Sequence, residues 1–241
     1  MLKSFGRLSM LFLVFVSCRS VVGVQHCDDF RIVRRPITFD STRSRLSLEY
    51  MSTHYGIDKN HPTIHPQMVV VHWTDIPSIE ATFDAFNPVK LPGSRKKISS
   101  AGALNVSAHY MVDRDGTVYR LLPDTIFARH VIGLNHCAIG IENIGSQSMP
   151  LTKKQLQANV CLIQTLRRKY PIQYVLGHHE YTRFIGHPLW LEKDPNYLTQ
   201  KIDPGDAFMQ SLRKALAPLH FKPLPPLNPS VHPAIDEIPK N

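Results

Sequence analysis

The stretch Gln67–Trp73 has the sequence QMVVVHW and determines the fold that we expect. Its run of apolar, mostly β-branched residues is typical of a strand buried inside a sheet. Two further runs of this kind, Cys137–Glu142 (CAIGIE) and Tyr174–Leu176, follow along the chain. Helical patterns alternate loosely with these strands. We therefore predict an α/β fold, in which a single domain over about residues 60–218 has a central mixed β-sheet flanked by helices.

The best-defined helix is predicted over Thr152–Tyr170. Thr152 can cap its first turn, Gln155 stands where a capping box needs its second partner, and an apolar stripe follows at helical spacing. Asp115-Gly116 separates two strand-like runs and predicts a β-hairpin. The other expected elements are helices over 44–54, 77–86 and 206–217 and hairpin strands over 107–113 and 117–122.

The composition is that of a globular chain with extensions. Of the 241 residues, 43% are hydrophobic and 20% are charged, which excludes a disordered or fibrous protein. The formal net charge of +9 suits an anionic partner such as a nucleic acid, lipid headgroups or a cell-wall polymer. The sequence contains no basic helix or base-stacking surface, so we expect no nucleic-acid partner.

The N-terminus has the pattern of an export signal. A basic segment, 1–7, precedes the apolar run 8–17 (LSMLFLVFVS), which is short for a membrane span and typical of a signal peptide. Two processing routes are open. Residues 15–18 (FVSC) resemble a bacterial lipobox, which would put an outer-membrane lipid anchor on Cys18, whereas ordinary cleavage up to Val24 would not. Removal of the signal lowers the net charge from +9 to +6.

The four cysteines do not form a metal ribbon or a redox motif. Cys18, Cys27, Cys137 and Cys161 contain no CxxC spacing. A disulfide can form in an oxidising compartment, but the sequence leaves its pairing open. Because Cys161 falls within a predicted amphipathic helix, we expect it in the core rather than in a bridge.

Three residues at the ends of predicted elements can bind a metal ion. His72 ends one strand, His178 follows another, and Asp203 lies in the segment KIDPG. Two imidazoles and one carboxylate are the protein ligands of many catalytic zinc sites, which keep a fourth position open. On spacing alone, a metal site is weakly indicated, and ordinary packed or solvated residues are the favoured interpretation.

Five segments in order carry a family resemblance: VVVHWT, VSAHYMVDRDGTVYRLL, AIGIENIG, GHHE and KIDPGDAF. Together they resemble the zinc-dependent N-acetylmuramoyl-L-alanine amidases of the AmpD-like, type 2 family, relatives of peptidoglycan-recognition proteins and phage endolysins. The resemblance covers about residues 67–215. It implies hydrolysis of the amide between N-acetylmuramic acid and L-alanine in peptidoglycan or muropeptides.

The resemblance also implies the ligands of one catalytic Zn²⁺. They are His72, His178 and Asp203, in a surface groove at the strand ends, while His179 is a neighbour of the site. In such a site zinc polarises the amide carbonyl and lowers the pKa of a water to about 7.

Two charged residues match catalytic positions of the family. Glu142 corresponds to a glutamate that takes a proton from water and returns it to the leaving amine. Lys201 corresponds to a lysine that can stabilise the oxyanion of the tetrahedral intermediate. Without the resemblance, an ordinary surface pair is the favoured interpretation of Glu142, and a solvated surface lysine is the alternative for Lys201.

Four residues match substrate-binding positions of the family. His130 corresponds to a histidine that lines the substrate groove, and Arg129 replaces the tryptophan before it, where it can pair with a carboxylate of the peptide. Asn135 is expected to bond the peptide backbone, and His109 is assigned to the same group with less support. Ala108 stands where some relatives have a catalytic tyrosine, which favours the glutamate-dependent mechanism.

The resemblance divides the chain into four parts. They are a signal peptide (1–24), an N-terminal extension (25–60), the amidase domain (61–218) and a Pro-rich tail (219–241), which we expect to be free or to run as an extended arm over the domain. Residues 179–200 form an insertion relative to short family members. We expect the insertion to pack as a flap over one wall of the groove, and His187 within it is a weaker candidate metal ligand.

These features predict an exported zinc amidase, either a periplasmic protein, a membrane-anchored lipoprotein or a secreted one. Its expected partner is a peptidoglycan or muropeptide substrate, and we expect a monomer. The alternative is a non-catalytic peptidoglycan-recognition module. Such a module would usually lack part of the metal set, whereas this sequence retains all of it.

Overall fold

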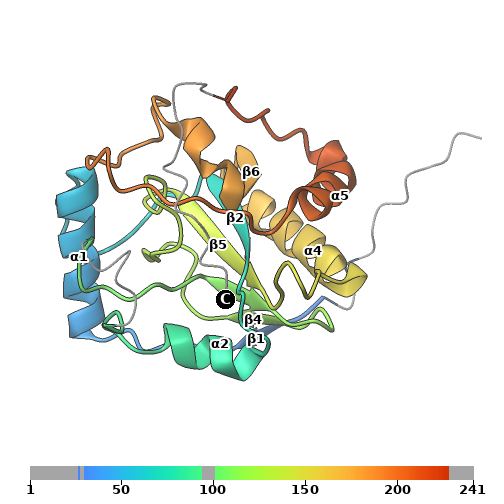
Figure 1. Cartoon of the computed structure of the whole chain (residues 1–241), viewed down its shortest axis with the longest axis horizontal. Helices are drawn as coiled ribbons and strands as arrows, with labels where there is room; N and C mark the ends of the chain where they lie inside the picture. Colours follow the sequence, from blue (N-terminus) through green and yellow to red (C-terminus); the bar gives the residue numbers. More distant parts are fainter. Residues whose placement is uncertain (1–26, 28–29, 94–100, 228–241) are drawn as a thin grey trace, which may run out of the picture.

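A computed structural model describes residues 27, 30–93 and 101–227 (Figure 1). The predicted signal segment, including Cys18, and the end of the Pro-rich tail lie outside the described residues. Within them, no helix combines the length and the apolar character that a membrane crossing requires.

Six strands form one mixed sheet in the order β1-β4-β3-β5-β2-β6. Only β3 and β4 pair antiparallel, as the hairpin at Asp115-Gly116 predicts, and all other neighbours are parallel. The strands are β1 (Ile32–Arg34), β2 (Met68–Trp73), β3 (Tyr110–Val112), β4 (Val118–Arg120), β5 (Ala138–Asn143) and β6 (Tyr174–Gly177). The predicted α/β fold with a central mixed sheet is confirmed, and the short edge strand β1 is an addition to it.

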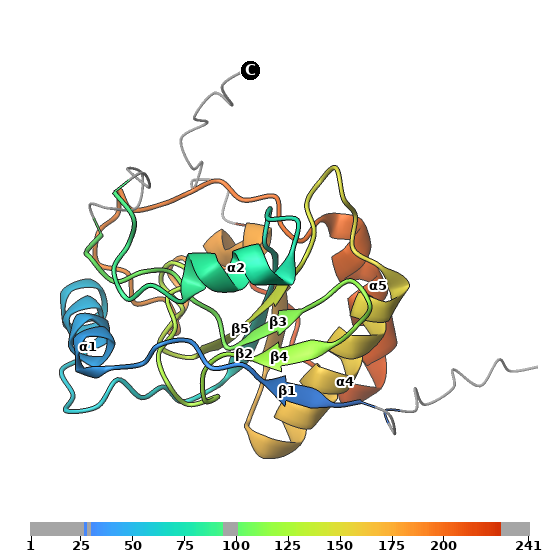
Figure 2. The same cartoon turned by 90° about the horizontal axis from the view of Figure 1, so that it is seen from below.

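Helices cover both faces of the sheet (Figure 2). The pair α4 and α5 packs on one face, α2 lies over the other, and α1 stands at the side of the domain (Figures 1 and 2). The bounds are α1 (Ser41–Tyr55), α2 (Ile79–Phe86), α4 (Lys153–Lys169), α5 (Asp206–Leu216) and the short 3₁₀ helices η1 (His178–Phe184) and η2 (Ala217–Leu219).

The two faces of the central strands differ because side chains alternate along a strand. Val69 and Val71 of β2 join the core under α4 and α5, whereas Met68 and Val70 join the opposite core. By the same alternation, His72 lies on the same face of the sheet as Met68 and Val70. The neighbouring strands repeat this division, with Ile139, Ile141 and Val175 on the first face and Ala138, Tyr174 and Leu176 on the second.

The start of α4 is fixed by the predicted capping box. The Gln155 N–H donates to Thr152 Oγ1 at 3.1 Å, and the Thr152 N–H donates to Gln155 Oε1 at 2.9 Å. The amide of Gln155 also donates to the carbonyls of Ile144 (2.9 Å) and Val112 (3.2 Å), which lie at the ends of strands β5 and β3. This buried side chain therefore caps the helix and attaches it to the sheet.

Cys161 is buried as predicted, with 3% of the residue exposed, but it forms a disulfide with Cys27, so the expectation that it would not be part of a bridge was wrong. Periodicity placed Cys161 correctly on a helix, but only the tertiary path brings the segment before β1 alongside α4. The bridge closes a chain separation of 134 residues. Cys137 is the buried free cysteine among the described residues, and burial raises the pKa of its thiol to about 12.

The insertion and the start of the tail both pack on the domain. Trp190 lies against Gly133, where a Cβ atom would come within 2.5 Å of the indole, and Gly133 also adopts a φ of +76°. The tail is extended and two hydrogen bonds attach it to the domain. The Lys222 N–H donates to Gln173 O at 2.8 Å, and Arg183 Nε donates to Pro225 O at 2.6 Å. As far as Leu227, the tail is thus an extended arm over the domain.

His109 connects β3 to β5 instead of reaching a substrate. The Gly140 N–H donates to its Nδ1 at 3.0 Å, and its Nε2 contacts the Ile126 carbonyl at 2.8 Å. The ring is fully buried, and burial lowers its pKa to about 4. A neutral ring with its proton on Nε2 satisfies both contacts. The expected substrate contact of His109 is therefore corrected to a role in the fold.

We predict that removing the disulfide destabilises the fold. The variant Cys27→Ser/Cys161→Ser should lose about 3–5 kcal/mol of unfolding free energy, because the long closed loop no longer restricts the unfolded chain. Urea denaturation of oxidised and reduced protein measures this. Reductant should lower the stability of the natural chain and leave the double variant unchanged; equal stability of both oxidised proteins would contradict the prediction.

The buried ring of His109 predicts acid sensitivity. Its pKa is about 4 in the folded chain against 6.5 for a free side chain, so between these values only the unfolded chain binds the proton. Stability should fall as the pH drops from 6.5 towards 4, by about 1.4 kcal/mol per pH unit for this group. His109→Gln should show a shallower slope in urea denaturation at pH 7, 6 and 5, with the exposed His61→Gln as matched control. Identical slopes for all three proteins would refute this.

Candidate metal centre

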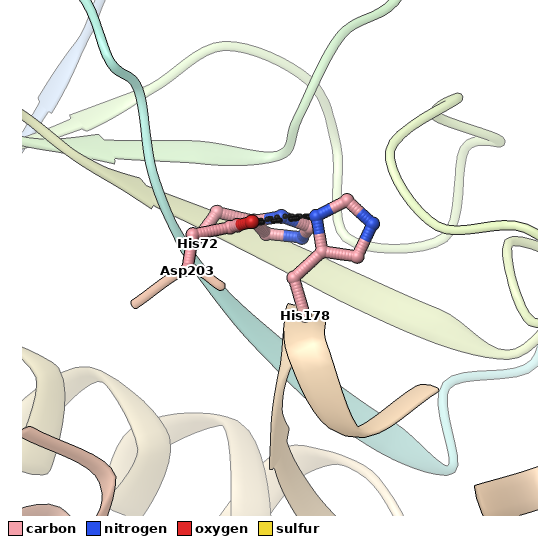
Figure 3. A group of neighbouring side chains, drawn as sticks. All are labelled: His72, His178 and Asp203. Atoms are coloured by element: carbon pink, nitrogen blue, oxygen red, sulfur yellow. Dashed lines mark hydrogen bonds and ion pairs between the residues drawn. The ribbon is translucent and has the colours of Figure 1, made fainter. Parts of the chain in front are cut away.

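His72, His178 and Asp203 come together in one buried cluster (Figure 3). The Nδ1 atoms of the two histidines are 2.9 Å apart. Oδ2 of Asp203 lies 3.1 Å from Nδ1 of His178 and 3.2 Å from Nδ1 of His72. The exposed fractions of the three residues are 1%, 7% and 7% in chain order. The cluster predicted from the sequence thus exists in the fold.

The parallel pairing of β2 and β6 brings the two histidines together. Val71 pairs with Gly177, so the next residues along both strands, His72 and His178, lie side by side at the same sheet edge. Asp203 arrives from the segment before α5. Its carbonyl accepts the backbone N–H of His179 at 3.0 Å, which fixes the carboxylate beside His178.

His179 and His187 do not belong to the cluster. Nδ1 of His179 lies 3.0 Å from the Asp203 carbonyl and its Nε2 lies 3.0 Å from Asp206. His187 accepts the Leu189 N–H at 3.1 Å and its Nε2 is 3.5 Å from the Tyr174 hydroxyl. Both rings are therefore held by other partners, in agreement with the choice of His178.

The protonation states suit a cation. Burial lowers the pKa of His178 to about 4, and the positive charge of Lys201 acts in the same direction. Burial alone would raise the pKa of Asp203, but the two imidazoles outweigh it and hold this pKa well below the ordinary value. Near neutral pH the cluster therefore presents neutral His178 and an ionised carboxylate, which are the forms that bind metals.

His130 orients His72 from behind. Its Nε2 lies 3.2 Å from the Ala138 carbonyl, which can only accept, so this nitrogen carries the proton. Burial keeps the pKa of His130 well below its usual value, so its Nδ1 is an acceptor for Nε2 of His72 at 3.1 Å. The proton of His72 is then on Nε2, and its Nδ1 lone pair faces the cluster. Such outer partners are typical of metal-bound histidines.

Gly140 makes room for the ring of His130, which connects the Ala138 carbonyl to His72; we call this chain of two contacts the relay. A Cβ atom on Gly140 would come within 2.8 Å of the ring of His130, so a side chain at this position of β5 would displace the ring. Asn135 holds the backbone beneath, because its Oδ1 accepts the N–H groups of His130 and Val131, both at 2.8 Å. The position of His130 thus depends on Gly140 of β5 and on the turn that Asn135 holds.

Glu142 and Lys201 lie around the cluster. In the parallel ladder, Glu142 of β5 pairs directly with His72 of β2, so both side chains rise from the same face of the sheet. Glu142 is half-buried. Lys201 is half-buried two residues before Asp203, and its charge acts on His178. The strand register therefore places Glu142 next to His72, while Lys201 comes from the same segment as Asp203; the catalytic roles of both residues stay predictions.

Two predicted substrate residues belong instead to the framework. Arg129 is 2% exposed, and its guanidinium donates to the carbonyls of Gly102 (3.2 Å) and Leu104 (2.5 Å) and to the Tyr197 hydroxyl (3.0 Å). Asn135 is 1% exposed, and its Nδ2 donates to the Tyr55 hydroxyl at 2.9 Å. Their polar atoms already have protein partners, so we correct both assignments. His130, the fourth predicted substrate residue, contacts a ligand of the cluster.

The donor set fits zinc. Nitrogen and oxygen atoms about 2.0–2.1 Å from a tetrahedral zinc lie about 3.3 Å apart, close to the 2.9–3.2 Å in the cluster. With Nδ1 of His72 acting as an acceptor, a single proton on Nδ1 of His178 cannot satisfy both His72 and Asp203. A cation satisfies all three atoms at once.

Comparisons with known proteins show to which sequences and structures this chain is similar. Residues 59–206 match the sequence model of a family described as N-acetylmuramoyl-L-alanine amidase. The chain is 33% identical over 85 residues to the endolysin of Escherichia phage T7, and 32% identical over 85 residues to that of Enterobacteria phage T3. Each match covers 33% of this chain and 56% of the endolysin, so the chain spans about half the length of these curated relatives.

A solved structure shares the fold at low sequence identity, and a second one is similar to a lesser degree. A crystal structure of AmpD covers 76% of this chain and 93% of its own, with 20% identity and a TM-score of 0.50. The amidase LysC from Clostridium intestinale covers 80% of this chain and 99% of its own, with 20% identity and a TM-score of 0.49. Since the family's sequence model matches more than half of the residues, the chain belongs to the N-acetylmuramoyl-L-alanine amidase family.

Proposed function

We propose that this protein is a zinc-dependent hydrolase that cleaves the amide between N-acetylmuramic acid and L-alanine in peptidoglycan or muropeptides. The observation that carries the proposal is the buried cluster of His72, His178 and Asp203 with Glu142 on the adjacent strand. A recognition module needs no complete ligand set and no carboxylate beside it. Family membership supports the same reaction.

Each residue has a defined task in this proposal. His72, His178 and Asp203 hold the zinc, which supplies Lewis acidity towards the amide carbonyl and lowers the pKa of water. Glu142 takes a proton from the attacking water and delivers it to the nitrogen of the leaving amine. The ammonium group of Lys201 donates to the oxyanion of the tetrahedral intermediate, where a fixed charge contributes most.

We also propose that the protein works outside the cytoplasm. The Cys27–Cys161 disulfide supports this, because such bridges persist mainly in oxidising compartments. The basic and apolar pattern of residues 1–24 supports it as well. An exported amidase would meet the intact wall, and the route, whether periplasmic, secreted or lipid-anchored through Cys18, is tested by mass analysis of the mature N-terminus.

We predict that Glu142→Gln lowers kcat by about 100-fold or more and leaves bound zinc unchanged, because it removes only the proton carrier. Purified protein should be incubated with sacculi and with soluble anhydro-muropeptides, and released peptides identified by mass spectrometry. A chelator should abolish cleavage and zinc should restore it. Full zinc loading without cleavage of either substrate would refute the enzyme and favour a recognition module.

The relay through His130 predicts an effect on metal affinity. His130→Ala should weaken zinc binding by about 10- to 100-fold. The substitution removes the acceptor for Nε2 of His72, so the His72 ring is no longer held in one orientation. Competition with a fluorescent chelator measures this without any substrate. His187→Ala is the matched control and should bind zinc like the natural chain. Unchanged affinity in a folded His130→Ala protein would contradict the relay.

A further inference from the structure

A second cavity of about 400 Å³ lies between α1, residues 101–104 and residues 192–194. None of the metal ligands lines it. The polar side chains that line it are Glu49, Tyr50, Thr53 and His54 from α1 and Glu192, Lys193 and Asp194 from the insertion. Three of these seven residues are carboxylates and one is a lysine, although the protein as a whole is basic.

Glu192 is the central feature of this cavity. Its side chain is 1% exposed. Oε1 lies 2.8 Å from Nδ1 of His54 and accepts the N–H groups of Lys193 (3.1 Å) and Asp194 (3.0 Å). Oε2 has no hydrogen-bond partner among the residues that the structure describes. A buried carboxylate oxygen left in this way favours a ligand that brings a donor.

The surroundings favour a cationic donor. The hydroxyl of Tyr50, a residue that is 3% exposed, also has no hydrogen-bond partner within the described part of the chain. The ring of Tyr50 stacks on His54 with centroids 4.2 Å apart, and the guanidinium of Arg129 lies 5.0 Å from its centroid, so a ligand would meet the hydroxyl of Tyr50 rather than its ring. Nζ of Lys193 lies beside Gly56, past the C-terminus of α1, where the helix dipole attracts it. The ammonium group of Lys193 therefore interacts with the C-terminal end of α1.

The cavity is connected to the metal centre by consecutive contacts. The ring of His54 lies 5.4 Å from that of Tyr197, whose hydroxyl accepts a hydrogen bond from Arg129 at 3.0 Å. Arg129 is followed by His130, which contacts His72. These contacts run through buried side chains, so one part of the core connects the cavity with the metal centre.

We propose that this cavity binds a protonated primary amine on the peptide part of the substrate, with Glu192 and Tyr50 as its direct partners. The inference rests on the proposed function, because the peptide is that of the muropeptide. α1 lies before residues 59–206, the part that matches the family, and residues 192–194 belong to the insertion. The cavity would therefore give this chain a preference for peptides with a free side-chain amine.

Two synthetic muropeptides test the proposal. Both carry the peptide L-Ala-D-Glu-L-Lys on N-acetylmuramic acid, one with a free lysine amine and one with that amine acetylated. Titration calorimetry with the Glu142→Gln protein avoids cleavage during the measurement. We expect about tenfold or greater weakening on acetylation, because the charged hydrogen bond is lost. Equal affinities, or no binding of either compound, would overturn the proposal.

Variants locate the effect. Adding Glu192→Gln keeps the shape and the contacts of Oε1 but removes the charge, and should make the two affinities equal within twofold. Glu80→Gln removes the same charge on the distant surface of α2 and should keep the full difference. A preference that survives Glu192→Gln would place the amine elsewhere and overturn the assignment. Cadaverine alone should bind far more weakly; equal binding would indicate a general amine site instead.

Cleavage by the natural chain separates this proposal from the proposed function. Cleavage of both muropeptides with equal kcat/KM would leave the amidase standing and overturn the amine site. A preference in binding without cleavage of either compound would support the amine site and refute the hydrolase. Faster cleavage of the free amine, lost in Glu192→Gln, would support both.

Discussion

The parallel register of β2 between β5 and β6 is the constraint on which the site depends. This register places Glu142 opposite His72 and brings His178 to the same edge one residue after Gly177. A slip of one residue would turn every side chain of the strand to the other face. Both faces of β2 are apolar up to Val71, so such a slip would cost most at His72, whose imidazole would enter the apolar core under α4 and α5. The chemistry is therefore aligned by the same forces that bury the core.

The metal centre adds a second constraint, which is the orientation of imidazole rings that are largely buried. The Ala138 carbonyl, His130 and His72 form a chain in which each proton position follows from the previous one. The chain starts from the backbone of β5, and Gly140 in the same strand leaves the space for it. A fold that supplies both the ligand strand and the acceptor for its outer partner does not need a metal to orient His72.

The sequence was sufficient to predict what local patterns and the family motifs encode. Strand β2, the capping box of α4 and the set of His72, His178 and Asp203 depend on neighbours in the chain or on motif order. Side-chain contacts across the fold were not accessible in this way. Arg129 and Asn135 appeared available for substrate because nothing local shows that Tyr197 and Tyr55 meet them. The disulfide and edge strand β1 likewise depend on the path of the N-terminal segment.

The buried polar groups of this domain differ in how fully the protein satisfies them. Asn135 uses its acceptor twice and bonds its amide to Tyr55, so it leaves nothing for a ligand to gain. At the metal centre, acceptor atoms of three side chains face one another at 2.9–3.2 Å, and too few protons are present to bond them all. Burying such a set is costly unless a cation joins it. Glu192 also has a buried acceptor atom, Oε2, that no donor reaches among the described residues. It lies between α1 and the insertion, which are both outside the sheet. In both places buried acceptor atoms lack donors, so both places are suited to cations: a metal ion at the strand ends, and an ammonium group beside α1.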